Sequence, residues 1–217
     1  MITKQKTPTY FFELRQLSRS RFVAGVDEVG VAPLAGPVVA AAVILDPKKV
    51  GRLRTKNKWW FGVRDSKMLN HLRREELAKI IYANAISVGV GSCSVEEIDL
   101  LNIFQARLIA MKRAVESLKT LPDFVFIDGN ASLPQLSVSQ KCVVAGDQKI
   151  LSVACASIVA KVTRDNILKN MHQRFPEYGF DKHKGYPTKL HQQKLKQFGP
   201  CEVHRKTFAP VRESLSR

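Results

Sequence analysis

The sequence predicts an α/β domain in which a five-stranded sheet is flanked by helices. Short apolar runs typical of buried strands alternate with longer segments that have helical spacing, and glycine and proline mark the connections. Several of the runs end directly in an acidic residue. The five strand-like runs are residues 22–28, 38–45, 86–93, 124–127 and 141–145. At 217 residues the chain is long enough for one domain with an appendage.

The first two strands enclose the most informative stretch, residues 22–45, which reads FVAGVDEVGVAPLAGPVVAAAVIL. The carboxylates of Asp27 and Glu28 follow an apolar run that looks fully buried. Because an unpaired buried carboxylate is costly, these two acids need a partner, and a metal ion is one candidate.

The middle of the chain alternates helices with the third strand. Asn70 is placed to cap a helix over residues 71–85, and Ser94 with Glu97 forms a capping box that opens another helix after the strand at 86–93. Apolar residues at roughly helical spacing predict a further helix over residues 102–119.

Two later strands each lead into an aspartate. Residues 124–127 run into Asp128, and residues 141–145 run into Gly146 and Asp147. Side chains that serve a site in an open α/β sheet gather at the carboxyl ends of strands. We therefore expect these aspartates to converge with Asp27 and Glu28.

The last third of the chain carries one long helix and a basic C-terminal segment. Small residues such as Ala154, Ala156 and Ala160 line a predicted helix over residues 150–171 and allow close packing on the sheet. Residues 174–188 have loop-like composition, and residues 190–198 predict a further helix.

The charge balance favours an anionic partner. The formal net charge is +16 and the isoelectric point is about 9.9, and the excess of basic residues lies at the two ends of the chain. Nucleic acid is the first expectation. The alternative is a solvated basic surface that serves only solubility.

Cysteine usage and apolar runs point to a soluble cytoplasmic protein that does not enter the membrane. The four cysteines form no C-x-x-C pair and are expected to be buried free thiols in a reducing compartment. The N-terminal residues lack the apolar core of a signal peptide. The longest apolar run, residues 31–45, is shorter than the ~20 residues that span a bilayer.

Residues 48–64 interleave basic and aromatic side chains. Seven lysines and arginines accompany the adjacent Trp59, Trp60 and Phe61 in a stretch that we interpret as a surface loop. This composition suits a nucleic-acid backbone and unstacked bases. An aromatic cluster packed on the core explains the same residues.

Motifs spread over residues 22–214 resemble those of ribonuclease HII, the type 2 ribonuclease H. Nine of them occur in the family's order. They are GVDEVG at 25–30, PLAGPVVAAAVIL at 33–45, DSK at 65–67, LIAMKRAVE at 108–116, IDGN at 127–130, GD at 146–147, ASIVAKVTRD at 156–165, YGFDKHKGYPT at 178–188 and HRKTFAPVRE at 204–213.

The resemblance implies a ribonuclease H-like fold with three antiparallel strands first in a mixed sheet. It divides the chain into an N-terminal extension (1–21), a catalytic domain (22–173) and a small C-terminal helical segment that binds substrate (174–217). We expect a monomer.

The resemblance also implies the activity and its metal site. Asp27, Glu28, Asp128 and Asp147 correspond to the family's four catalytic, metal-binding carboxylates, with Asp27 as the ligand shared by both ions. Hard oxygen ligands of this kind select Mg²⁺ or Mn²⁺. The implied reaction is two-metal-ion hydrolysis of RNA in RNA–DNA hybrids, or 5′ of ribonucleotides in duplex DNA, leaving 3′-hydroxyl and 5′-phosphate ends.

The remaining matched positions imply contacts with nucleic acid. Tyr186 matches the tyrosine that packs on the deoxynucleotide sugar after a ribonucleotide and so distinguishes an RNA–DNA junction from RNA. Solvated or packing side chains are the alternative at each position. The other expected contacts are Gly30, Val31, Ala32, Ser66, Lys67, Lys161, Lys184 and Arg205.

One departure from the family pattern weakens the expected grip on substrate. Residues 30–32 read Gly-Val-Ala where the family has Gly-Arg-Gly, and valine has no donor to replace a guanidinium. Positive charge is also missing at Met68, Ala131 and Ala145. Two alternatives follow: a ribonuclease H that prefers continuous hybrids, or a hybrid-binding protein with weak or lost incision.

Overall fold

The computed structural model describes residues 7–51, 58–64 and 66–215, without the side chain of Lys67. Five strands make up its sheet: β1 (Val23–Val29), β2 (Val38–Leu45), β3 (Ala85–Cys93), β4 (Phe124–Asp128) and β5 (Ser139–Val143). The α-helices of this part of the chain are α1 (Phe11–Gln16), α2 (Pro47–Val50), α3 (His71–Asn84), α4 (Val95–Leu101), α5 (Ile103–Glu116), α6 (Leu151–Arg174), α7 (Phe180–His183), α8 (Lys189–Phe198) and α9 (Ala209–Leu215).

The sheet is mixed, with the strand order β3-β2-β1-β4-β5. The first three strands pair antiparallel, whereas β4 and β5 join parallel to β1. This confirms the predicted fold class. Because β1 and β4 are parallel neighbours, their carboxyl ends lie at the same edge of the sheet.

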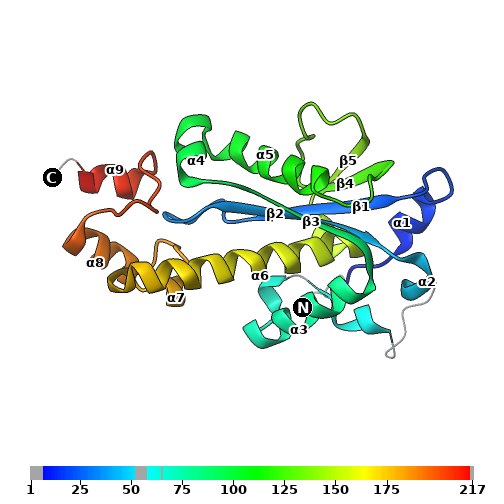
Figure 1. Cartoon of the computed structure of the whole chain (residues 1–217), viewed down its shortest axis with the longest axis horizontal. Coiled ribbons are helices and arrows are strands. Elements are labelled where there is room, and N and C mark those ends of the chain that lie inside the picture. Colours follow the sequence, from blue (N-terminus) through cyan, green and yellow to red (C-terminus); the bar gives the residue numbers. More distant parts are fainter. Residues whose placement is uncertain (1–6, 52–57, 65, 216–217) are drawn as a thin grey trace, which may run out of the picture.

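Helices cover both faces of the sheet (Figure 1). Helices α4 and α5 lie on one face, and α6 and α3 lie on the other. Two glycines allow this close packing, since a Cβ at Gly25 would lie 2.4 Å from the backbone nitrogen of Val153 in α6, and one at Gly91 would lie 2.3 Å from the carbonyl oxygen of Ala110 in α5. Both side-chain positions are therefore closed to any larger residue.

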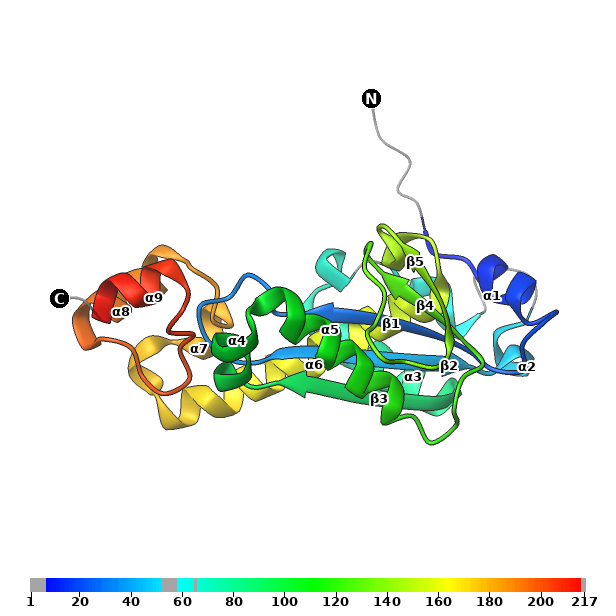
Figure 2. The same ribbon diagram turned by 90° about the horizontal axis from the view of Figure 1, so that it is seen from above.

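The long helix α6 carries the C-terminal segment. It extends past the end of the sheet, where α7, α8 and α9 gather around its far end (Figures 1 and 2). A separate apolar cluster that includes Ala35, Leu168, Tyr178 and Phe180 joins this segment to the loop after β1. Within the described residues, no helix combines the length and apolar character needed to cross a bilayer.

The residues before β1, which the sequence predicts to be an N-terminal extension, pack against the start of α6. Thr9 forms a β-bridge with Ile150, and Tyr10 is buried. The side chain of Glu13 in α1 is also buried, and its Oε1 accepts a 2.7 Å hydrogen bond from the backbone nitrogen of Ser152. Glu13 thus caps α6, whose own N-cap residue, Ile150, supplies no side-chain bond.

The basic-aromatic stretch divides between core and surface. The indole of Trp60 is buried, and its Nε1 donates to the carbonyl of Val50. Phe61 is partly exposed. The core-packing alternative is therefore confirmed for Trp60, while residues 52–57 of the predicted loop lie outside the described part of the chain.

The buried Glu13 predicts a pH-dependent stability. Burial raises its pKa to about 7 from the ordinary 4.5, so the folded state binds this proton more tightly than the unfolded state. The contribution of Glu13 is then most favourable below pH 4.5 and decreases until about pH 7. Relative to Glu13→Gln, the wild-type free energy of unfolding should fall by up to about 1.4 kcal/mol per pH unit across this window.

Urea denaturation of both proteins between pH 5 and pH 8 tests this expectation. The two curves of unfolding free energy should separate up to about pH 7 and run parallel above it. Curves that stay parallel throughout would show that burial does not raise the pKa of Glu13.

Candidate active site

The four acidic residues lie around one open cavity of about 380 Å³. Asp27 and Glu28 stand near the carboxyl end of β1, and Asp128 is the last residue of β4. Val26 and Ile127 are register partners in the parallel pair, which brings Asp27 next to Asp128. The expected convergence of these acids is therefore present.

Asp147 reaches the cavity by a different route from the one predicted. Strand β5 ends at Val143, and Ala145 then adopts a left-handed conformation with φ of 53°. A 3₁₀ turn over Gly146–Gln148 follows and directs Asp147 to the cavity. The backbone nitrogen of Gly146 donates a 2.6 Å hydrogen bond to Asp128, which couples the turn to the end of β4.

The electrostatics of the cavity are unfavourable without a counter-charge. Asp27 is only 5% exposed, and its pKa is raised well above the ordinary value, first by burial and then by the negative charges of Glu28 and Asp128. Its Oδ1 accepts a hydrogen bond from the backbone nitrogen of Glu28 at 2.7 Å. A side-chain hydrogen bond with Ser157 also lowers this pKa, but the two bonds do not offset burial and the negative charges of Glu28, Asp128 and Asp147.

Glu28 has a cationic partner that the sequence did not reveal. Its Oε1 lies 3.0 Å from Nη1 of Arg107 in α5, and both side chains are largely buried. Burial raises the pKa of Glu28, and Arg107 opposes this rise. The other oxygen, Oε2, is buried and has no hydrogen-bond partner among the described residues.

This donor set fits a divalent cation. The four carboxylates are hard oxygen ligands, the buried Oε2 of Glu28 lacks a partner, and a cation would offset the repulsion at Asp27. Among the described residues no three acidic, histidine or cysteine side chains lie in an arrangement that could hold a metal ion as they stand.

Several of the expected nucleic-acid contacts line the same cavity. They include the Gly30–Val31–Ala32 tripeptide, Ser66, Lys161 and Tyr186. Val31 and Tyr186 are 38% and 37% exposed. Ser66 is buried against Ser157, with 3.1 Å between the hydroxyl oxygens, and Lys161 pairs with Asp165 at 2.7 Å.

Two expected phosphate contacts lie elsewhere. The ammonium of Lys184 donates to the carbonyl of Asp181. Arg205 has no exposed surface, and its guanidinium donates to the carbonyls of Gly30, Val31 and Gly36. The expectation of a direct phosphate contact is therefore wrong for Arg205 in this structure. The side chain of Lys67 lies outside the described part.

A second buried arginine completes a clamp on the loop between β1 and β2. Arg164 in α6 donates to the carbonyls of Pro37, Ala35 and Lys184, at 3.0 Å in each case. Burial and, to a smaller extent, the nearby charge of Arg164 lower the pKa of Arg205 to about 9. Arg205 holds the tripeptide through the carbonyls of Gly30 and Val31, and Arg164 links the following residues of the loop to α6 and to the C-terminal segment.

A mixed sheet of this topology, with carboxylates over the ends of β1 and β4, defines a ribonuclease H-like nuclease. The family model described as Ribonuclease HII matches residues 24–211, so the chain belongs to the ribonuclease HII family. It is therefore an endoribonuclease that acts on RNA–DNA hybrids.

Similar proteins agree with this assignment. Ribonuclease HII of Burkholderia pseudomallei (strain 1710b) is 52% identical over 192 residues, which cover 88% of this chain and 85% of the relative. Ribonuclease HII of Burkholderia ambifaria is 52% identical over 193 residues, 89% of this chain and 84% of the relative. The crystal structure of ribonuclease H2 from Pyrococcus horikoshii has a TM-score of 0.75 and 28% identity, covering 90% of this chain and 98% of that one.

The negative charges close to Asp27 predict that removing its charge will raise stability and abolish activity. Replacing Asp27 by asparagine removes a buried charge while keeping the shape, so we expect Asp27→Asn to stabilise the metal-free protein by about 1–3 kcal/mol at pH 8. Cleavage should be lost. Thermal melts in EDTA, with the surface substitution Glu116→Gln as control, measure the first effect, and a lower melting temperature for Asp27→Asn would refute it.

The ion pair of Glu28 with Arg107 predicts a change in metal affinity. Arg107→Gln removes a cation that competes for the Glu28 carboxylate, so the affinity for Mn²⁺ should rise about three- to tenfold. Isothermal titration calorimetry measures this affinity directly. Weaker Mn²⁺ binding by the variant would show instead that Arg107 holds Glu28 in its ligating position.

Proposed function

We propose that this ribonuclease HII hydrolyses RNA in hybrids and also incises 5′ of single ribonucleotides in duplex DNA, leaving 3′-hydroxyl and 5′-phosphate ends. The observation that carries this proposal is the shared cavity. Its walls include all four carboxylates together with the tripeptide at 30–32 and the side chain of Tyr186. Cleavage and recognition groups thus face the same space.

The carboxylates act as the catalytic ligands in this proposal. Asp27 lies between Glu28 and Asp128, which favours it as the ligand shared by two ions, while Asp128 is oriented by the backbone nitrogen of Gly146. Bound Mg²⁺ or Mn²⁺ would supply activation of water and stabilisation of the leaving oxygen. Glu28 would turn from Arg107 to complete the site.

The residues around the acids orient the substrate. Tyr186 offers a partly exposed ring for the sugar that follows the ribonucleotide. Ser66, Lys67 and Lys161 are proposed to lie along the phosphates. Because Lys161 is paired with Asp165, it binds a phosphate only by sharing or leaving that ion pair.

Val31 favours continuous hybrids as the preferred substrate. An apolar side chain occupies the exposed position where the family carries arginine, so one charged hydrogen bond to the ribonucleotide region is missing. Arg205 nevertheless holds the carbonyls of Gly30 and Val31. Backbone recognition is thereby kept while the charged contact is lost.

The cellular setting follows from the same proposal. A basic protein with a nucleic-acid cavity and free cysteines suits the reducing cytoplasm. We propose that it acts there as a monomer on hybrid or ribonucleotide-containing duplexes.

Restoring the family tripeptide tests the assignment of residues 30–32. In Val31→Arg/Ala32→Gly, a regained charged hydrogen bond of about 1.5–3 kcal/mol should raise incision at a single ribonucleotide about ten- to a hundred-fold. Cleavage of a continuous hybrid should change less. The assay compares both substrates with Mg²⁺ and with Mn²⁺.

Asp128→Asn serves as the catalytic control in the same assay and should abolish both reactions. An unchanged ratio of the two substrates in the restored protein would contradict the role of the tripeptide. Tight, salt-sensitive binding with no metal-dependent cleavage by the wild type would favour a hybrid-binding function instead.

A further inference from the structure

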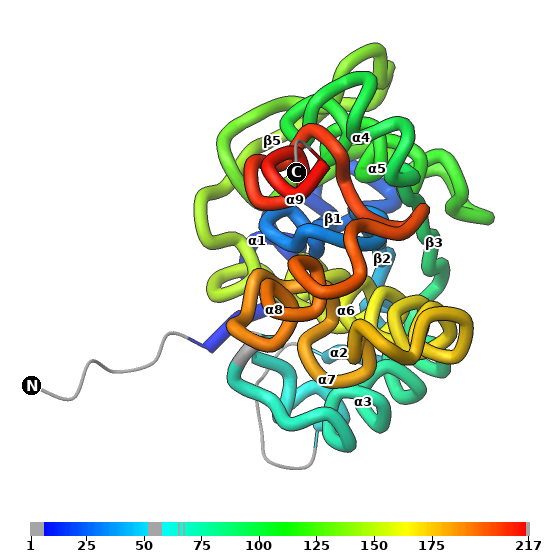
Figure 3. Tube along the Cα trace, turned by 90° about the vertical axis from the view of Figure 1, so that its left-hand side faces the viewer, coloured from blue at the N-terminus to red at the C-terminus, as the bar shows by residue number. Residues whose placement is uncertain are grey.

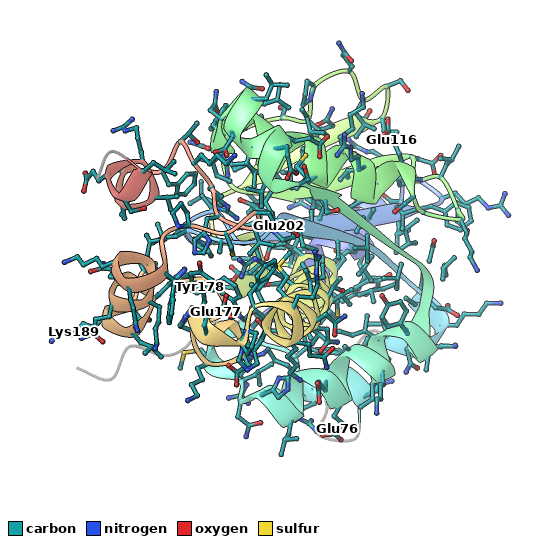
Figure 4. The ribbon with its side chains drawn as sticks, turned by 60° about the vertical axis from the view of Figure 1, so that its left-hand side comes forward. Glu76, Glu116, Glu177, Tyr178, Lys189 and Glu202 are labelled. Atoms are coloured by element: carbon teal, nitrogen blue, oxygen red, sulfur yellow. The ribbon has the colours of Figure 1, made fainter. Side chains whose placement is uncertain are left out.

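Three buried histidines form a cluster in the C-terminal segment, away from the carboxylates. His191 and His204 have no exposed surface, and His183 is 8% exposed. They belong to α7, α8 and the turn before α9, which surround the end of α6 (Figure 3). Tyr178, labelled in Figure 4, lies between α8 and α6 and packs its ring 4.9 Å from that of His204.

The hydrogen bonds of this cluster have only one consistent direction. The backbone nitrogen of Cys201 donates to Nδ1 of His204 at 3.0 Å, so the proton of neutral His204 lies on Nε2. That Nε2 is 3.0 Å from Nε2 of His191, which must accept. The proton of His191 therefore lies on Nδ1, and it is donated to the carbonyl of Tyr186 at 2.9 Å.

Burial keeps this chain of bonds in its neutral form. It lowers the pKa of both His191 and His204 to about 4. A charged imidazole has no acceptor nitrogen, so protonation of either ring would break the bond that the ring accepts. At neutral pH the direction from Cys201 to Tyr186 is the stable one.

The third histidine, His183, binds the backbone on the N-terminal side of Tyr186. The ring of His183 stacks on that of His191 with 4.3 Å between centroids. Its Nδ1 accepts from the backbone nitrogen of Gly185, and its carbonyl accepts from the backbone nitrogen of Tyr186. The ring of His191 thus binds the carbonyl of Tyr186, while the ring of His183 binds the backbone nitrogen of the preceding residue, Gly185.

The loop before β2 restrains this tyrosine further. The backbone nitrogen of Leu34 donates to the carbonyl of Gly185 at 2.8 Å. Gly185 has a φ of 81°, and a Cβ there would lie 2.5 Å from the carbonyl oxygen of Ala35. The backbone of Tyr186 is therefore fixed relative to residues 34–35, and Tyr186 lines the same cavity as residues 30–32.

We propose that His191 is a positioning residue for Tyr186, and that the directed bonds from Cys201 through His204 and His191 set the enzyme's discrimination of an RNA–DNA junction. This inference rests on the proposed role of the tyrosine. His191 contacts the backbone of Tyr186 and acts on substrate only through the place that it gives the ring.

Two substitutions at His191 separate positioning from general stability. Asparagine places an amide donor near the position of Nδ1 and can still bond the carbonyl of Tyr186, but it loses the contact with His204. Glutamine places its amide near Nε2 and keeps that contact instead. Junction discrimination should therefore be retained in His191→Asn and fall about three- to tenfold in His191→Gln.

The readout is the ratio of incision at a single embedded ribonucleotide to cleavage of a continuous hybrid by the full-length protein with Mn²⁺. Tyr178→Phe is the matched control, because it removes the partly buried hydrogen bond from the tyrosine hydroxyl to the carbonyl of Gly199 in the same segment. It should lower the melting temperature without changing the ratio.

The double variant with Tyr186→Ala completes the test. Tyr186→Ala keeps the carbonyl that His191 binds but removes the ring, so adding His191→Gln should lower the melting temperature further without lowering the ratio again. A fall in the ratio in both backgrounds would overturn the positioning role, as would equal ratios for His191→Gln and His191→Asn.

The outcome for Tyr186→Ala alone separates the two proposals. If it lowers the ratio while His191→Gln does not, the positioning inference fails and the proposed role of Tyr186 stands. If Tyr186→Ala leaves the ratio unchanged, the role of the tyrosine fails and the positioning inference fails with it.

Discussion

The concentration of negative charge over the carboxyl ends of β1 and β4 is the constraint on which the site depends. Parallel pairing places Asp27 next to Asp128, and the turn after β5 adds Asp147. Burial makes each charge more costly, as the raised pKa of Asp27 shows. A cavity of this kind needs cations, and Arg107 supplies only one. A divalent metal ion, which enzymes of this family use, would meet this requirement.

The proposed recognition of substrate depends on two buried arginines that organise the backbone of the site. Arg164 and Arg205 lie beneath the loop between β1 and β2 and bind its carbonyls rather than phosphates. The hydrogen bonds of the two arginines connect the loop that carries residues 30–32 to α6 and to the C-terminal segment. Arg164 also donates to the carbonyl of Lys184, which fixes the C-terminal segment to the same helix. The groups that we propose to contact substrate, which come from distant parts of the chain, are thereby held around one cavity.

The sequence was sufficient for the fold and for the acids because each has a local signal. Apolar runs ending in Asp128, and the capping residues Asn70 and Ser94, are patterns that depend on neighbours in the chain. The residues that pair with buried charged or polar groups cannot be identified from their neighbours in the sequence. Arg107 reads as an ordinary helical arginine, and Arg205 reads as a surface cation, because their burial depends on contacts far away in sequence. The left-handed Ala145 likewise departs from the usual preference for glycine, so the end of β5 was placed two residues late.

We propose that a divalent cation balances the carboxylates and thereby enables hydrolysis. The most direct measurement is one Mn²⁺ titration in which the melting temperature and the rate of hybrid cleavage are followed together. Both should rise over the same range of Mn²⁺ concentration, and Asp27→Asn should remove both responses. Cleavage without stabilisation, or stabilisation that persists in Asp27→Asn, would contradict this proposal.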